Sequence, residues 1–326
     1  MNTSASILHQ PPLSHSQGIK EDAVLINNDI FTSIFSYLLK EDRDKIAQPN
    51  LIIGENGSGK TSLLKRMYLS IENSGKQLKP VFIEGKELFS TDDIWKFCPL
   101  QDDSCRTVLL IDNIQYYFER TDNTEQYNLR GKLNKAGAPI LIATSDKVLP
   151  AFTDYESAFF EGFKISYIRP LAVTDYSMFV GNETDMTRLE NLMSYLPKTP
   201  RSVQIAAKII EDSTSPETDI MLLIDYFSFY YQAKYDGYVV QIQRILSAIA
   251  RAEDGVSLQE IRQMTGQDNG KISPYLKLMA DRKIIDKTSK TQRGGIYTIA
   301  DPLFRLWLQT NVSCSQHNIV PQVRTV

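Results

Sequence analysis

GENGSGKTS, residues Gly54 to Ser62, is the stretch that decides the fold of the first half of this chain. It fits the pattern G-x-x-x-x-G-K-[ST], in which Lys60 and Thr61 fill the last two positions. The apolar run Leu51–Ile53 precedes it, and a helical apolar pattern follows over Thr61–Ile71. A glycine-rich loop between a strand and a helix is the context that this motif requires, so the sequence predicts a phosphate-binding P-loop.

The predicted loop has the chemistry to bind a nucleoside triphosphate with magnesium. Its glycines allow the backbone to fold around phosphate oxygens, and the following helix directs its positive end at the anion. Lys60 is expected to reach the β- and γ-phosphates, and the Thr61 hydroxyl to bind Mg²⁺. The predicted nucleotide contacts are Gly54, Glu55, Asn56, Gly57, Ser58, Gly59, Lys60, Thr61 and Ser62.

A second motif, TVLLIDNIQ at Thr107–Gln115, contains the acid expected to complete the magnesium site. Asp112 ends an apolar run, which is where P-loop enzymes place the carboxylate that holds Mg²⁺. Many ATP-hydrolysing enzymes of this kind carry another acid directly afterwards, to activate the attacking water. Here that position is Asn113, whose amide cannot accept a proton, and this favours ATP binding with slow hydrolysis.

Further positions bear on the nucleotide. A GTPase needs D-x-x-G and N-K-x-D, whereas this chain has DNIQ at 112–115 and NKAG at 134–137, so ATP is the predicted ligand. PILIATS is a strand ending in hydroxyls, where Thr144 or Ser145 could contact the γ-phosphate; the alternative is a plain strand end. Arg201, in the first turn of a helix, could reach the nucleotide or could be a solvated surface arginine.

Composition restricts the class of protein and its compartment. The chain has 326 residues, enough for about two domains, with 42% apolar residues and a net charge of −3. Its three cysteines form no CxxC pair and no secretory signal is visible, which indicates a reducing, cytoplasmic compartment. No membrane span is expected, because the most apolar segment, Ile220–Tyr231, is interrupted by Asp225 and is much shorter than a span. The three histidines lie near the ends, so histidine-dependent catalysis and histidine-ligated metals are not expected.

Strand and helix patterns predict an α/β core followed by helices. Apolar runs recur at Leu51–Ile53, Val81–Ile83, Val108–Ile111, Ile140–Ala143 and Ile165–Ile168. Helical stretches separate them, so we predict a parallel sheet covered on both faces. We also expect an additional strand in the sheet between the Walker A motif, which is the P-loop, and the Walker B motif, which ends at Asp112. The expected organisation is a disordered arm at 1–20, a P-loop core at 21–170, an all-helical lid at 171–237, a winged helix at 238–310 and a disordered tail at 311–326. Within the lid, the apolar segment Ile220–Tyr231 is predicted to be a buried helix.

The C-terminal pattern of three helices and a β-hairpin predicts a winged helix, with Ser273–Pro274 at the start or in the first turn of its third helix. Residues 270–295 contain seven basic side chains against two acidic ones, in a chain whose total charge is negative. Such a patch can bind duplex DNA through phosphates, and the candidate contacts are Lys287, Lys290 and Arg293. The alternative is a winged helix that docks protein, with its basic turn simply solvated.

GENGSGKT, LLIDN, LIATS, the sequence TPR at Thr199–Arg201 and the ending DPLFRLW together resemble AAA+-related ATPases. The chain is similar to archaeal-type ATPases of the STAND group and to origin-recognition-type initiators over roughly residues 24–310. The resemblance implies a five-stranded core, a helical lid, a winged helix and a nucleotide-controlled switch. The segment Ala158–Tyr167, where ring-forming relatives often carry an arginine finger, contains no arginine.

These features together predict an ATP-dependent switch that hydrolyses slowly and couples nucleotide state to a DNA-binding winged helix. A positioned base contributes about 10²–10⁴ in rate and an arginine finger about 10³–10⁵, so their loss slows turnover without weakening ATP binding. Glu55 or Glu119 could replace the missing base. The alternatives are a signalling or scaffold ATPase whose winged helix binds protein, and a small-molecule kinase.

Overall fold

The computed structural model describes residues 27–40, 45–98, 105–252, 254–291 and 294–312. The chain divides into two compact units: Met1–Gly181 with Lys198–Gln204, and Asn182–Pro197 with Ile205–Val326. The predicted arm at 1–20 and nearly all of the predicted tail at 311–326 lie outside the described residues. Within the described part of the chain, no helix is both long enough and apolar enough to cross a membrane.

A five-stranded parallel sheet, ordered β2-β3-β4-β1-β5, is the centre of the first unit. Its strands are β1 (Asn50–Ile53), β2 (Leu78–Glu84), β3 (Arg106–Asp112), β4 (Ile140–Ser145) and β5 (Lys164–Tyr167). All five predicted strands are present. In the sheet, β4 lies between the strand that leads into the P-loop and the strand that ends at Asp112, which confirms the predicted additional strand.

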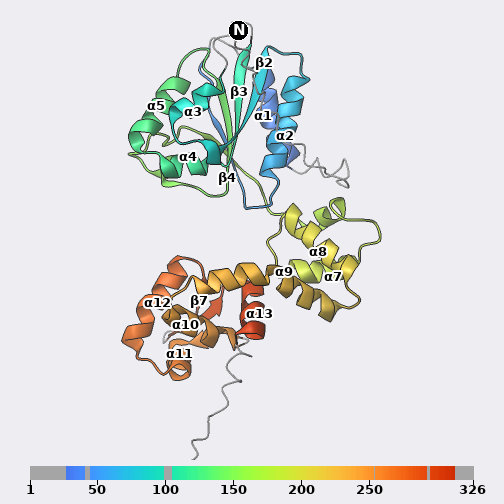
Figure 1. Cartoon of the computed structure of the whole chain (residues 1–326), viewed down its shortest axis with the longest axis vertical. Coiled ribbons are helices and arrows are strands. Elements are labelled where there is room, and N and C mark those ends of the chain that lie inside the picture. The colour runs from blue at the N-terminus through green and yellow to red at the C-terminus, as the bar shows by residue number, and fades with distance from the viewer. Residues whose placement is uncertain (1–26, 41–44, 99–104, 253, 292–293, 313–326) are drawn as a thin grey trace, which may run out of the picture. The chain divides into compact units, whose positions relative to one another are not determined.

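Helices cover both faces of this sheet (Figure 1). One face packs against α1 (Asn28–Lys40) and α2 (Lys60–Glu72); toward the other lie η2 (Gly85–Glu87), α3 (Thr91–Lys96), α4 (Gln115–Arg120), α5 (Asn123–Leu133) and α6 (Pro150–Thr153). Side chains alternate between the two faces along each strand. Phe82 and Leu110 pack with α1 and α2, whereas Ile83 and Ile111 pack on the opposite face.

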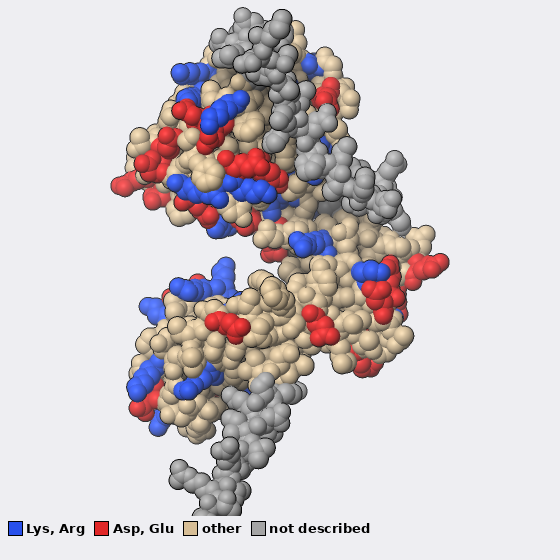
Figure 2. All heavy atoms as spheres, in the orientation of Figure 1, with Lys and Arg blue, Asp and Glu red and all other residues tan. Residues whose placement is uncertain are grey.

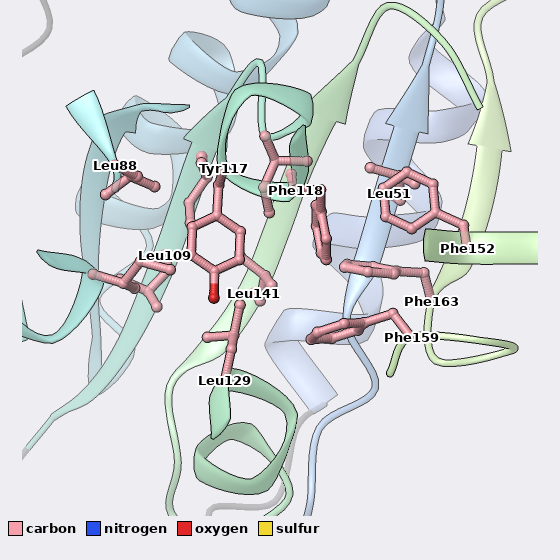
Figure 3. Packing of buried hydrophobic residues seen from close by; sticks show 14 of the residues in the cluster. Leu51, Leu88, Leu109, Tyr117, Phe118, Leu129, Leu141, Phe152, Phe159 and Phe163 are labelled. Atoms are coloured by element: carbon pink, nitrogen blue, oxygen red, sulfur yellow. The ribbon is translucent and has the colours of Figure 1, made fainter. Parts of the chain in front are cut away.

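Aromatic rings fill the core on the face covered by α3, α4 and α5 (Figure 3). The Phe118 ring of α4 meets the rings of Phe152 and Phe159 edge-on, at centroid distances of 5.0 and 5.3 Å. Phe163 stacks on Phe159 at 5.0 Å. This cluster holds α4, the helix that directly follows the Asp112 strand, against the sheet.

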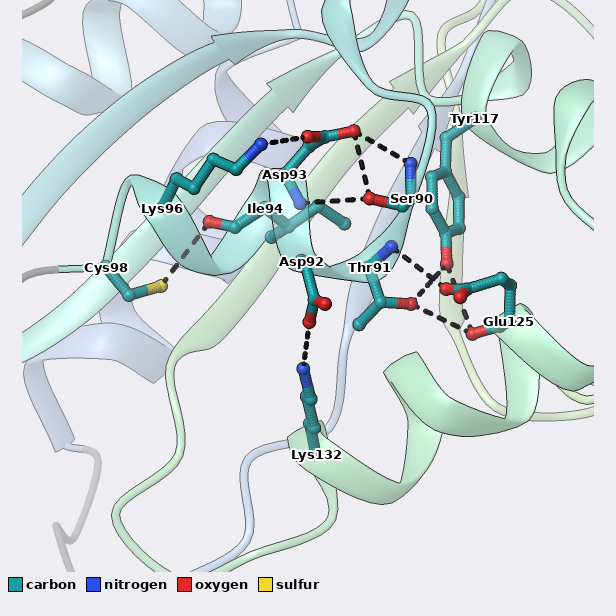
Figure 4. A network of polar contacts seen from close by, with 10 residues as sticks. All are labelled: Ser90, Thr91, Asp92, Asp93, Ile94, Lys96, Cys98, Tyr117, Glu125 and Lys132. Carbon is teal, nitrogen blue, oxygen red and sulfur yellow. Dashed lines mark hydrogen bonds and ion pairs between the residues drawn. The ribbon is translucent and has the colours of Figure 1, made fainter.

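A polar network fixes α3, a helix that the sequence analysis did not predict (Figure 4). Ser90 caps it and shares a capping box with Asp93, whose pKa is lowered to about 2 by hydrogen bonds from Lys96 and the Phe89 N–H. The Thr91 hydroxyl contacts the Tyr117 hydroxyl at 3.0 Å and donates to the Glu125 carbonyl at 3.0 Å. These contacts join α3 to α4 and α5.

The second unit begins with helices, as predicted for residues after Pro170. After η3 (Val173–Met178) in the first unit come α7 (Met186–Met193), α8 (Pro200–Asp212), whose first turn belongs to the first unit, and α9 (Pro216–Asp236). Arg188 of α7 makes two hydrogen bonds to the buried Asp219 of α9, at 2.8 and 2.5 Å. Toward its other end α9 meets the last helix, where the Tyr231 hydroxyl donates to Asp301 at 3.0 Å.

The predicted burial of Ile220–Tyr231 is correct for one face of α9 only. Leu223, Ile224 and Tyr231 are buried, but Phe229 is 88% exposed, and Tyr226 and Tyr230 are each 58% exposed. The apolar run is too continuous for its sequence to separate the two faces, because aromatic residues occur on both.

The remaining residues form the helices and hairpin that the sequence predicts, in the predicted order. They are α10 (Val240–Ala250), β6 (Val256–Ser257), α11 (Leu258–Thr265), α12 (Asn269–Asp281), β7 (Ile285–Thr291), β8 (Gly294–Ile299) and α13 (Pro302–Asn311). The short strand β6, which was not predicted, completes a sheet ordered β6-β8-β7. The helix α12 begins at Asn269, so the prediction that Ser273–Pro274 start the helix or lie in its first turn is wrong: Pro274 is inside the helix, more than one turn beyond its observed start.

Candidate functional site

A glycine of the P-loop allows the first turn of α8 to approach the loop backbone closely. Gly57 has a φ of 81°, and a Cβ there would lie 2.7 Å from the Cβ of Arg201. The Arg201 N–H donates to the Gly57 carbonyl at 3.3 Å. The first turn of α8 therefore rests directly on the loop, and Arg201, predicted as a candidate nucleotide contact, lies beside it with an exposed side chain.

Lys60, at the start of α2, is held in the base of the loop. Its Nζ donates to the carbonyl oxygens of Gly54 and Glu55, at 2.7 and 2.9 Å. Burial lowers the pKa of the Lys60 ammonium, and the nearby carboxylates of Asp112, Asp146 and Glu55 oppose that shift. A desolvated ammonium surrounded by backbone carbonyls is well prepared to exchange some of these contacts for phosphate oxygens.

Asp112 brings together side chains from three elements. The Thr61 hydroxyl of α2 donates to its Oδ2 at 2.5 Å, and the Thr144 hydroxyl of β4 donates to its Oδ1 at 2.5 Å. The Thr144 oxygen in turn accepts a hydrogen bond from the Asn113 N–H at 2.9 Å. Asp112 and Thr144 are buried at the carboxyl edge of the sheet, which is where ligands bind in open α/β sheets.

Thr61 and Asp112 fit a magnesium ion as the predicted metal ligands. Their oxygens are adjacent and hard, and Mg²⁺ in such sites takes one or two protein oxygens together with phosphate oxygens and water. The described residues hold no group of three or more His, Cys, Asp or Glu side chains that could bind a metal by themselves. A bound Mg²⁺ would neutralise charge on the phosphates.

Asn113 adopts a backbone conformation that suits asparagine. Its φ is 57°, in the left-handed region where asparagine is several-fold enriched. Its carbonyl lies so close to Gly85 that a Cβ at position 85 would be 2.3 Å from the oxygen. The turn after β3 and the turn after β2 are thus packed backbone to backbone.

The hydroxyls at the end of β4 differ in their contacts. The Thr144 proton is directed at Asp112, whereas Ser145 Oγ donates to the Lys147 carbonyl at 2.6 Å and closes its own turn. Of the two residues predicted as γ-phosphate contacts, Thr144 is the one joined to the candidate metal site. Contact with phosphate stays a prediction for both.

Two acidic residues near this site were missed by the sequence analysis. Glu84, the last residue of β2, is in register with Asp112 on the neighbouring strand. Burial and the charge of Asp112 raise the pKa of the Glu84 carboxyl. Asp146 lies close enough to Lys60 to raise the pKa of that lysine, and its Oδ1 has no hydrogen-bond partner among the described residues. The sequence signal for Glu84 is an acid ending the run VFIE, but its neighbour is set by strand order.

Glu119 and Glu55, the two carboxylates predicted as replacement bases, have contacts that differ from those of Asp112. Glu119 of α4 forms an ion pair with Lys147 at 2.5 Å. Glu55 is exposed on the loop, and only its backbone carbonyl contacts Lys60.

The candidate DNA contacts lie on and after β7. Lys287 is exposed, with its ammonium 5.8 Å from the centre of the Tyr297 ring, and Lys290 lies on the same strand. Arg293 lies outside the described residues. Other exposed basic residues are Lys271 and Lys277 on α12 and Arg282 and Lys283 directly after it. Basic side chains gather over this part of the second unit in Figure 2.

Comparison with known proteins shows the fold. No protein-family model matches the chain, and no curated protein matches its sequence significantly. The structure is similar to the Walker-type ATPase PABY2304 of Pyrococcus abyssi, with a TM-score of 0.56 and 13% identity over 91% of this chain and 99% of that chain. The Aeropyrum pernix ORC1 protein in complex with DNA is similar at a TM-score of 0.49 and 12% identity, over 89% of this chain and 92% of that chain. The AMPPCP-bound DnaA of Aquifex aeolicus is similar at 0.41 and 17%, over 82% of this chain and 94% of that chain. The predicted fold class, a parallel-sheet P-loop NTPase core followed by a helical region, is confirmed.

Proposed function

We propose that this chain, which has the fold of P-loop ATPases, binds ATP with Mg²⁺ and acts as a switch that hydrolyses its nucleotide slowly. The observation that supports ATP binding most directly is the convergence of Lys60, Thr61 and Asp112 at one edge of the sheet, with Thr61 Oγ1 2.5 Å from Asp112 Oδ2. The proposed contacts are the loop N–H groups and Lys60 for the phosphates, and Thr61 and Asp112 for the metal.

Slow turnover is expected because two catalytic groups are absent from their usual positions. Asn113 is no proton acceptor, and no arginine occurs in Ala158–Tyr167. An arginine finger raises the turnover rate by a factor of about 10³–10⁵, and a typical enzyme turns over about ten times per second. We therefore expect ATP turnover on the order of 10⁻² per second or slower.

The experiment that tests this proposal measures binding and turnover separately. Equilibrium binding of fluorescently labelled ATP and GTP, with and without Mg²⁺, should show a preference for ATP that depends on the metal. Single-turnover hydrolysis of γ-labelled ATP, with and without duplex DNA, then gives the rate. Absence of ATP binding would overturn the proposal, and turnover at ordinary enzyme rates without DNA would overturn the slow switch.

We further propose that the C-terminal residues 238–310 form a winged helix that engages duplex DNA through phosphates. The exposed basic residues of α12, of the turn that follows and of β7 support this assignment. The chain carries a net charge of −3, so its basic side chains must be concentrated locally to attract DNA.

Charge reversal tests DNA binding directly. The variant Lys287→Glu/Lys290→Glu/Arg293→Glu is expected to weaken duplex binding by at least about tenfold at low salt and to flatten the salt dependence, because fewer counterions are released. Fluorescence anisotropy with one labelled duplex at several salt concentrations measures both quantities. A matched control reverses Lys76, Lys79 and Lys164 in the first unit, all of them exposed. Equal binding by the test variant and the wild type would remove the DNA proposal.

The signalling or scaffold alternative also has an observation in its favour. Exposed aromatic residues on α9, Tyr226, Phe229 and Tyr230, are suited to contact a protein partner. Salt-independent affinity for duplex DNA, or none, together with nucleotide binding would favour this alternative.

A further inference from the structure

Glu84 ends β2 on the face of the sheet that faces α2. Phe82, two residues earlier, packs with α1 and α2, while Ile83 packs in the opposite core. Because side chains alternate along a strand, Glu84 projects to the same side as Phe82.

Asp112 projects from the next strand to the same side. Glu84 and Asp112 are register partners in the parallel pair β2–β3, and neighbouring strands lie about 4.8 Å apart. Leu110 packs with α1 and α2, and Asp112 lies two residues further on the same face. The carboxylate of Glu84 therefore lies beside the acid assigned to the metal, one strand farther from the P-loop.

The backbone after Glu84 is held in place by the turn after Asp112. The Asn113 carbonyl occupies the space where a side chain at position 85 would begin. This contact joins the end of β2 to Asn113, which stands where many ATPases carry a second acid. Glu84, on the neighbouring strand, therefore supplies a carboxylate near the position from which that acid is missing.

Other features of Glu84 suit a water-binding acid. It is half-buried, and among the described residues its carboxylate has no hydrogen-bond or ion-pair partner, in contrast to Glu119 with its lysine partner.

We propose that Glu84 is the carboxylate that orients the water attacking the γ-phosphorus of ATP and takes up its proton. This inference rests on the proposed ATP binding and slow hydrolysis. The water oxygen forms a bond to the γ-phosphorus, and the bond from that phosphorus to the β,γ-bridging oxygen breaks. The bridging oxygen leaves with the electron pair on ADP, inorganic phosphate is released, and Glu84 passes the proton to solvent.

The test compares Glu84→Gln with Glu87→Gln in the full chain. Glu87 is exposed in the adjacent turn, so its substitution removes the same charge a short distance away. Glu84→Gln is expected to lower single-turnover hydrolysis by about 100-fold or more, and the affinity for fluorescently labelled ATP to stay within about threefold. Glu87→Gln is expected to match the wild type within about twofold in both measurements.

A second readout follows the bound nucleotide itself. Protein incubated with ATP is freed of unbound nucleotide by gel filtration, and the retained nucleotide is identified by chromatography. Glu84→Gln should retain ATP after the wild type has come to hold ADP. The amounts of retained ATP and ADP show both that nucleotide stays bound and whether it has been hydrolysed.

Several outcomes overturn the inference. Unchanged hydrolysis in Glu84→Gln would do so, as would an equal loss in Glu87→Gln or a loss of ATP affinity that accounts for the slower rate. A wild type that binds ATP but never hydrolyses it would overturn the role of Glu84 and the slow ATPase, while ATP binding would stand. A wild type without ATP affinity would overturn this inference and the proposed function together.

Discussion

Replacement of Lys60 by alanine is expected to weaken ATP binding by about 100-fold or more and to abolish measurable hydrolysis. A hydrogen bond to a charged group contributes about 1.5–3 kcal/mol, and Lys60 is expected to make at least one to each of two phosphates. Titration calorimetry or a fluorescent ATP analogue measures the affinity. Binding of ATP by Lys60→Ala at the wild-type affinity would contradict the assignment of the loop.

The fold should tolerate this change. The substitution removes a buried cation whose pKa is already lowered by burial, which offsets the loss of donors to Gly54 and Glu55. The matched control is Lys76→Ala, an exposed lysine beyond the opposite end of α2, which should bind ATP like the wild type. Urea unfolding without nucleotide checks that both variants are folded.

Replacement of Phe118 by alanine is expected to destabilise the first unit by about 3–5 kcal/mol. Its ring makes edge contacts with Phe152, Phe159 and Phe163, so truncation leaves a cavity that three rings surround (Figure 3). Trp95 packs against the same cluster, and its fluorescence during urea unfolding measures the loss. The comparison is made in a Trp307→Phe background, in which Trp95 is the remaining tryptophan.

An exposed ring provides the control for this prediction. Tyr155 is 83% exposed, so Tyr155→Ala is expected to change the free energy of unfolding by less than about 1 kcal/mol. Similar losses in Phe118→Ala and Tyr155→Ala would show that the aromatic cluster does not stabilise α4. Because α4 begins two residues after Asn113, Phe118→Ala is also expected to bind ATP more weakly at urea concentrations near its unfolding midpoint.

Local patterns were sufficient to predict the strands and the loop. Buried parallel strands are short continuous apolar runs, and the P-loop has a spacing that few other structures share, so both are visible in a single sequence. The helix α3 was missed because six residues are too few to display a helical period; its cap at Ser90 is the signal that was available. The start of α12 was predicted too late because the prediction rested on Pro274, whereas the helix begins at Asn269, directly after Asp268.

Side-by-side relations between strands could not be predicted in the same way. Glu84 and Asp112 are 28 positions apart and become register partners because β2 lies at the edge of the sheet beside β3. Thr144 reaches Asp112 because β4 enters the sheet between β1 and β3. Both relations depend on the spatial order of strands, which hydrophobic runs along one chain do not encode.

The hydrogen bonds to Asp112 fix the direction of the hydroxyl protons of Thr61 and Thr144. Each hydroxyl has a single proton, and both protons are directed at the same carboxylate. Thr61 keeps its oxygen lone pairs as acceptors, which is the form in which a neutral alcohol binds a metal ion. Thr144 is left with lone pairs toward the Asn113 N–H, so it can donate to a phosphate only by releasing Asp112. We therefore expect the hydrogen bonds to a bound phosphate to come from Lys60 and the loop backbone rather than from these two hydroxyls.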